Sequence, residues 1–143
     1  MATQAKSVVR TENAPAPFQG APYSQAIRTG EFVFVSGQLG LKPDHGEISG
    51  GIEEQTEQVF ANLAAILAEA GTNLERLVKT TVFLADLADF GAMNEVYARH
   101  VGSSPPARST VEVAALPRAI SAGAPARARA GSRRADGAGL CGA

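Results

Sequence analysis

Short runs rich in β-branched and aromatic residues alternate with Gly- and Pro-rich segments in the first third of the chain. Residues 7–9, 24–28 and 32–38 form such runs and predict three strands. Between them, residues 14–22 (APAPFQGAP) predict a loop, because proline removes a backbone donor and glycine permits positive φ. The tripeptide Thr-Gly-Glu at 29–31 predicts a tight turn, so the last two strands should form a hairpin.

Two segments show the spacing of amphipathic helices. Across 52–70, apolar residues recur at three- and four-residue steps, and Gly71 fits a left-handed C-terminal stop. A second helix is predicted from an N-cap at Asp89 to Gly102, with a stripe formed by Phe90, Met93, Tyr97 and Val101. Residues 77–84 and 107–113 predict two further strands.

The predicted order is therefore β-β-β-α-β-α-β, which is typical of an α+β domain with its helices packed on one face of a sheet. A length of 143 residues suits one such domain. In the strand 107–113, alternation places Arg108, Thr110 and Glu112 on the same face.

Composition changes sharply near residue 118. Residues 119–143 contain nine Ala, five Gly and four Arg, too little apolar surface to offset the entropy of ordering. We therefore predict a folded domain over 1–118 and a disordered tail over 119–143. Residues 1–118 carry nine Lys+Arg against thirteen Asp+Glu, a charge of −4, and the whole chain carries −1, which argues against a nucleic-acid partner.

The sequence also disfavours membrane and metal functions. The longest apolar stretch, 63–68, is far shorter than a membrane span requires, and the first residues resemble no signal peptide. A single cysteine, Cys141, excludes an intrachain disulfide and a thiolate zinc site. His45 and His100 have no third ligand at suitable spacing, so we expect both at the surface and no bound metal. A cytoplasmic location is predicted.

Arg108 is the strongest candidate for ligand chemistry. It follows Pro105 and Pro106, and its planar guanidinium matches a carboxylate bidentately. The alternative is an arginine in a surface ion pair, which is the commoner case for an arginine taken alone. Glu112, on the same face, is interpreted as a structural partner.

Three other polar residues have structural alternatives. Tyr23 could close over a ligand or pack with its hydroxyl in water. Ser36 interrupts an apolar strand, and its alternative is a hydrogen bond to its own main chain. Asn94 could reach a site or remain solvated, whereas Tyr97 is predicted to be core.

Five motifs in this order resemble the RidA family of enamine/imine deaminases. They are GAPYSQ at 20–25, VSGQ at 35–38, VKTTVF at 78–83, MNEVY at 93–97 and PARSTVEV at 106–113. The resemblance extends from about residue 7 to residue 117. It implies a chorismate-mutase-like fold with a mixed sheet and a homotrimer with pockets between subunits, so Tyr23 and Arg108 of one pocket would come from different chains.

The same resemblance implies hydrolysis of 2-aminoacrylate-type intermediates, products of pyridoxal-phosphate enzymes, to 2-oxo acids and ammonia without a cofactor. Arg108 matches the arginine that holds the substrate carboxylate and is the expected catalytic residue. The expected substrate-binding residues are Arg108, Tyr23, Ser36, Asn94 and Thr110. Some members carry cysteine at the position of Thr110, so no thiol chemistry is expected there.

The chain departs from the family after residue 117. Members continue with an apolar strand whose glutamate orients the attacking water, whereas this sequence contains no Glu after Glu112. We hypothesise a reading-frame shift near Arg118, because out-of-frame translation of GC-rich DNA yields mainly Ala, Gly, Arg and Pro. The final strand is accordingly expected to be missing. Two alternatives to catalysis follow: a non-catalytic module that binds small carboxylates, or an inactive product.

Overall fold

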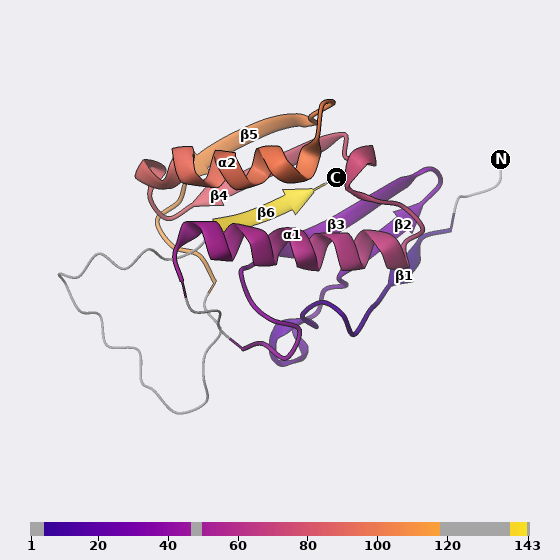
Figure 1. The fold of residues 1–143 in the computed structure, drawn as a ribbon. Helices are drawn as coiled ribbons and strands as arrows, with labels where there is room; N and C mark the ends of the chain where they lie inside the picture. The colour runs from indigo at the N-terminus through magenta and orange to yellow at the C-terminus, as the bar shows by residue number, and fades with distance from the viewer. Residues whose placement is uncertain (1–4, 47–49, 118–137, 143) are drawn as a thin grey trace.

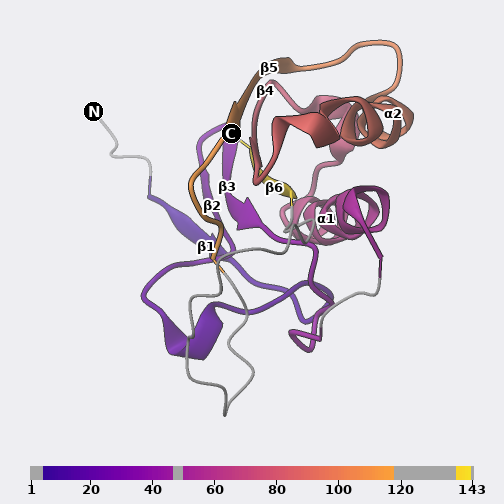
Figure 2. The same ribbon diagram turned by 90° about the vertical axis from the view of Figure 1, so that its left-hand side faces the viewer.

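The computed structural model describes residues 5–46, 50–117 and 138–142, and these form one six-stranded mixed sheet with two helices. The strands are β1 (Ser7–Val9), β2 (Ala26–Thr29), β3 (Phe32–Gln38), β4 (Lys79–Leu84), β5 (Ala107–Glu112) and β6 (Ala138–Gly142). Their order in the sheet is β1-β2-β3-β6-β4-β5 (Figure 1). The helices α1 (Ile52–Glu69) and α2 (Phe90–Val101) lie side by side on one face of the sheet (Figure 2). The predicted α+β class is confirmed.

Strand register decides which side chains face the helices. In the antiparallel strands β1, β2 and β3, the paired residues Val9, Ala26 and Val35 are all buried. Strands β4 and β5 are parallel and joined through α2, and their register pairs Thr80 with Arg108. Because paired residues of neighbouring strands point to the same face, Arg108 lies on the helix side with the buried Thr80.

The helix ends follow the sequence signals, with one correction. After α1, Gly71 adopts φ +84°, and the Thr72 N–H donates to the Leu67 carbonyl at 2.9 Å, which closes a Schellman motif. Asp89 occupies the predicted N-cap position of α2 but makes no side-chain cap hydrogen bond. Instead, the Asp86 carboxylate accepts from the Ala88 N–H at 2.8 Å and caps the 3-10 turn that leads into α2.

Two apolar clusters lie between the sheet and the helices. One joins α1 to β4 and α2 and contains Val59, Phe60, Val82, Leu84, Met93, Tyr97 and Val101. The other joins the C-terminal part of α1 to the strands β1, β2 and β3. The stripe predicted on α2 is confirmed at Met93, Tyr97 and Val101, but Phe90 remains 40% exposed. Neither described helix is long and apolar enough to cross a membrane.

The expectation that the final strand is missing is wrong. Strand β6 lies between β3 and β4 and pairs antiparallel with both; Leu140 is in register with Gln38 on one side and Val82 on the other. Without this strand, the facing edges of β3 and β4 would carry unpaired backbone donors and acceptors. Backbone pairing requires no particular side chain, and the sequence AGLCG contains no proline. Residues 119–137, most of the tail predicted to be disordered, lie outside the described residues, whereas residues 138–142 of that tail form β6.

Candidate functional site

Arg108 lies across two aromatic rings of α2. Its guanidinium carbon is 4.7 Å from the centroid of the Tyr97 ring and 5.5 Å from that of the Phe90 ring. Phe90 and Tyr97 are seven residues apart, about two helical turns, and therefore share a face of α2. Such cation–π contacts are worth about 0.5–2 kcal/mol each, more when the cation is shielded from water. They hold the face of the guanidinium and leave its N–H groups for another partner.

The Tyr97 ring is itself fixed by a buried hydrogen bond. Its hydroxyl lies 2.6 Å from the Thr80 hydroxyl, and both side chains are buried. Thr80 is the β4 residue in register with Arg108. The arginine and the ring beneath it are therefore tied to adjacent positions of the same pair of strands.

Two buried oxygens on the same side of the molecule lack partners. Among the described residues, Asn94 Oδ1 and Thr110 Oγ1 are shielded from solvent and accept or donate no hydrogen bond. Asn94 lies on α2 between Phe90 and Tyr97, and Thr110 lies two residues beyond Arg108 on β5. An unpaired buried polar atom costs roughly 1–3 kcal/mol, so these oxygens are suited to a ligand or a water.

The structure thus brings Arg108, Asn94 and Thr110 to the edge formed by α2 and β5, hereafter the arginine edge. Glu112 makes the structural contact expected of it, because its Oε2 accepts from the Leu87 N–H at 2.8 Å. The hydrogen bond of Thr80 to Tyr97 and the contact of Tyr97 with Arg108 were not predicted from the sequence. The signal was present, since Phe90, Asn94 and Tyr97 share one helix face.

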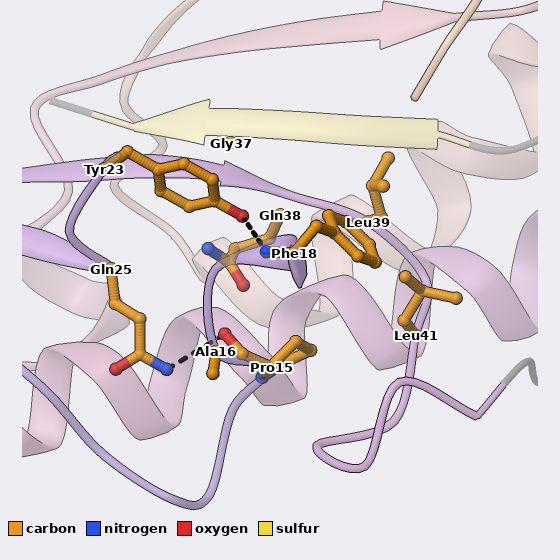
Figure 3. A pocket seen from close by; sticks show the side chains of 9 residues that line it. All are labelled: Pro15, Ala16, Phe18, Tyr23, Gln25, Gly37, Gln38, Leu39 and Leu41. Atoms are coloured by element: carbon orange, nitrogen blue, oxygen red, sulfur yellow. Dashed lines mark hydrogen bonds between the residues drawn. The ribbon is translucent and has the colours of Figure 1, made fainter. Parts of the chain in front are cut away.

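Tyr23 and Ser36 lie elsewhere: Tyr23 lines a small pocket on the β2–β3 side (Figure 3), and Ser36 is on β3, just before the pocket residue Gly37. The Tyr23 hydroxyl accepts from the Phe18 N–H at 3.2 Å, and Tyr23 is 44% exposed. The Ser36 hydroxyl donates to the main-chain carbonyl of Ser24, just before β2, at 2.5 Å. We call this group, with the loop at 14–23, the tyrosine edge.

Gln25 anchors the tyrosine edge and was not singled out by the sequence analysis. Its side-chain amide donates to the carbonyls of Thr11, Ala14 and Pro15 at 3.0–3.1 Å, and its oxygen accepts from the Thr11 N–H at 2.7 Å. The side chain is only 3% exposed, so these bonds replace water contacts that it has lost. They fix the proline-rich loop that carries Phe18 and contacts Tyr23.

The two edges cannot form one site within a single chain. Strands β6 and β4 separate β3 from β5, and three strand spacings amount to about 14 Å. A ligand that touches both Tyr23 and Arg108 therefore needs two copies of the chain.

The carboxyl group of Glu57, on α1, has a shifted pKa because it contacts two basic residues of α2. Hydrogen bonds from Arg99 and then His100 lower the pKa of Glu57, with distances of 2.7 and 2.6 Å. His100 also stacks on Phe60 with ring centroids 4.4 Å apart. His100 is thus packed between α1 and α2 and not simply a surface residue, which corrects the sequence-based expectation. Within the described residues, no cluster of His, Cys, Asp and Glu is arranged to hold a metal ion.

A family model described as Endoribonuclease L-PSP matches residues 11–122. The chain belongs to this family. Within the Endoribonuclease L-PSP family, the chain is 52% identical over 113 residues to Reactive Intermediate Deaminase A, chloroplastic, of Arabidopsis thaliana, covering 78% of this chain and 59% of that one. It is 44% identical over 119 residues to the 2-iminobutanoate/2-iminopropanoate deaminase of Mus musculus, covering 82% and 87%. The resemblance to RidA proteins is confirmed.

A solved structure of the family shares the fold. Escherichia coli TdcF with bound serine superimposes with a TM-score of 0.76 at 31% identity, covering 96% of this chain and 97% of that chain. The described residues therefore share the overall fold of this family member.

Proposed function

We propose that this protein hydrolyses enamine and imine intermediates that carry a carboxylate, releasing 2-oxo acids and ammonia. The observation that carries the proposal is the arginine edge: a guanidinium held flat on Tyr97 and Phe90, with the unpaired oxygens of Asn94 and Thr110 on the same edge. The names of the Arabidopsis and mouse relatives support a deaminase, and serine bound to a structural neighbour supports a small carboxylate as ligand.

The reaction needs few groups. The enamine 2-aminoacrylate gains a proton at C3 and loses one from nitrogen to become the imine. Water then adds across the C=N bond, and the carbinolamine expels ammonia, which takes the hydroxyl proton, to leave pyruvate. Arg108 holds the carboxylate by paired N–H donors, which fixes the imine carbon. Asn94 Oδ1 and the Thr110 hydroxyl are suited to accept from the imine N–H or from water. No cofactor is required for this chemistry.

We further propose that the active form is a homotrimer in which each pocket combines the arginine edge of one copy with the tyrosine edge of the next. The separation of the two edges supports this proposal. So does the sheet face turned away from the helices, where Val8 and Phe34 are 63% and 49% exposed and lie in one row through Ile27. Exposed apolar area of this kind marks an interaction surface.

One feature favours a second candidate, a carboxylate-binding module without turnover. The resemblance implies a water-orienting glutamate on the final strand, and β6 (AGLCG) contains no acidic residue. Asn94 and Thr110 hydrogen-bond water but do not take its proton at neutral pH. We therefore expect a low kcat even for a ligand that binds tightly.

The experiment couples a dehydratase that generates the imine to detection of 2-oxo acid, with and without this protein. Faster release than spontaneous hydrolysis supports the deaminase. Calorimetry with 2-oxobutyrate runs in parallel: binding without acceleration favours the module, and no binding with no acceleration overturns both.

A cytoplasmic location stays a prediction, since relatives include proteins named for chloroplasts and mitochondria. The charge of −4 over residues 1–118 disfavours a nucleic-acid partner.

A further inference from the structure

Arginine is a flexible side chain, and a site that depends on one must restrict its motion. Its four torsions give the side chain rotamer entropy that is lost when a ligand fixes it, unless the protein has fixed the side chain already. Here the Tyr97 and Phe90 rings approach the guanidinium within 4.7 and 5.5 Å. Phe90 is 40% exposed and Tyr97 only 5% exposed, so Tyr97 is the more rigid of the two supports.

The Tyr97 hydroxyl gives that support a defined place. The hydroxyl bonds Thr80 at 2.6 Å, and Thr80 is 1% exposed. From the core side, Phe60 packs edge-on against the Tyr97 ring with centroids 5.5 Å apart. Since Thr80 and Arg108 are paired residues of adjacent strands, the hydrogen bond sets the ring relative to the backbone that carries the arginine.

We propose that Tyr97 is a positioning residue for Arg108: its ring, held by Thr80, orients the guanidinium so that its N–H groups face the carboxylate of the ligand. The proposal rests on the proposed function for the identity of that ligand. It assigns Tyr97 a role beyond core packing: the ring acts on the arginine, and Thr80 and Phe60 together hold the ring, so loss of the Thr80 bond alone leaves it in place.

The binding test uses 2-oxobutyrate as the probe. Tyr97→Leu keeps an apolar side chain but removes the ring, and we expect its Kd to rise about three- to thirtyfold, which corresponds to the loss of one partly shielded cation–π contact. Tyr97→Phe keeps the ring and should bind within about threefold of the wild type, and Thr80→Val should resemble Tyr97→Phe. Equal affinity of Tyr97→Leu and the wild type would overturn the proposal.

Kinetics separate positioning from loss of stability. Because the carboxylate is held alike in the ground and transition states, Tyr97→Leu should raise KM and leave kcat nearly unchanged. Ile66→Val is the matched control, because Ile66 is fully buried in the other apolar cluster. It should lower the Tm without changing KM or Kd. If the control raises KM as much as Tyr97→Leu does, stability explains the effect and the proposal is wrong.

A ligand-free measurement keeps the proposal independent of the activity. In ¹⁵N NMR spectra, the Arg108 Nε–Hε signal, assigned by its loss in Arg108→Met, should be displaced by the ring current of Tyr97. The displacement should persist in Tyr97→Phe and disappear in Tyr97→Leu. An unchanged signal in Tyr97→Leu refutes the positioning role even if the protein hydrolyses imines. If the wild type neither binds 2-oxobutyrate nor hydrolyses imines, the proposed function fails, while this signal still decides whether Tyr97 orients Arg108.

Discussion

The arginine edge and the tyrosine edge are built on opposite principles. At the tyrosine edge, polar groups are satisfied internally: Gln25 bonds three carbonyls, Ser36 bonds Ser24, and Tyr23 accepts from Phe18. At the arginine edge, Asn94 Oδ1 and Thr110 Oγ1 are buried without partners. The polar groups named at the tyrosine edge thus have protein partners, whereas the two buried oxygens of the arginine edge need a ligand or a water as partner. The difference suggests that the tyrosine edge provides shape and the arginine edge provides binding energy.

Replacing the arginine should have the largest effect on ligand binding. Arg108→Met keeps an apolar chain over Tyr97 and Phe90 but removes two charge-assisted hydrogen bonds, so affinity for 2-oxobutyrate should fall roughly a hundredfold or more. Calorimetry measures the affinity, and circular dichroism verifies that the fold is intact. A folded variant that still binds as the wild type does would show that the binding energy comes from elsewhere.

Breaking the strand between the two edges should reduce stability most. Leu140→Pro removes a backbone donor from β6, which pairs on both sides, and should cost about 3 kcal/mol or more of unfolding free energy. Thermal and urea melts measure the loss. Ala115→Pro is the control, because Ala115 is exposed and lies outside the strands. Equal melts for the two variants would show that β6 contributes little to the sheet.

Mixing two inactive variants tests whether one pocket draws on both edges. Co-expression of Arg108→Met with Tyr23→Ala should restore activity, because random assembly of a cyclic trimer gives about a quarter of the pockets both wild-type halves. Each variant expressed alone provides the baseline. Mixed assemblies no more active than the two baselines would contradict a pocket shared between subunits.

Removing a buried hydroxyl that has no hydrogen-bond partner should give the smallest effect. The change should raise stability and lower ligand affinity. Thr110→Val removes an unpaired oxygen, so the unfolding free energy should rise by about 1 kcal/mol. Affinity for 2-oxobutyrate should fall a few fold if that hydroxyl contacts the ligand. A urea melt and calorimetry give the two values. Thr29→Val, the same change at a half-buried position of β2 outside the arginine edge, provides the reference.

Most helices and strands were predicted because their spacing, caps and turns can be read from short stretches of the sequence. The helix 52–70 and its stop at Gly71 followed from three- and four-residue spacing and from the φ that glycine permits, and the structure confirms both. The N-cap position of α2 was predicted correctly at Asp89, but its missing side-chain hydrogen bond was not, because Asp86 and Asp89 are both good caps and the path of the 3-10 turn gives the capping bond to Asp86.

Long-range pairing was not predictable in the same way. Strand β6 was missed because Ala- and Gly-rich sequence has weak strand preference, and its place depends on the gap between β3 and β4. Arg108 was found as a candidate by its chemistry, but its support by Tyr97 depends on which helix packs over β5. Tyr97 was therefore interpreted as core alone, although the same ring serves both the core and the arginine.

The position of β6 has a consequence for biosynthesis. Of the described strands it leaves the ribosome last, yet it occupies the interior of the sheet. Until β6 is made, the edges of β3 and β4 that it will cover have unpaired backbone groups in the growing chain. The sheet can close only after β6 has emerged, so growing chains are exposed to mispairing with one another until then.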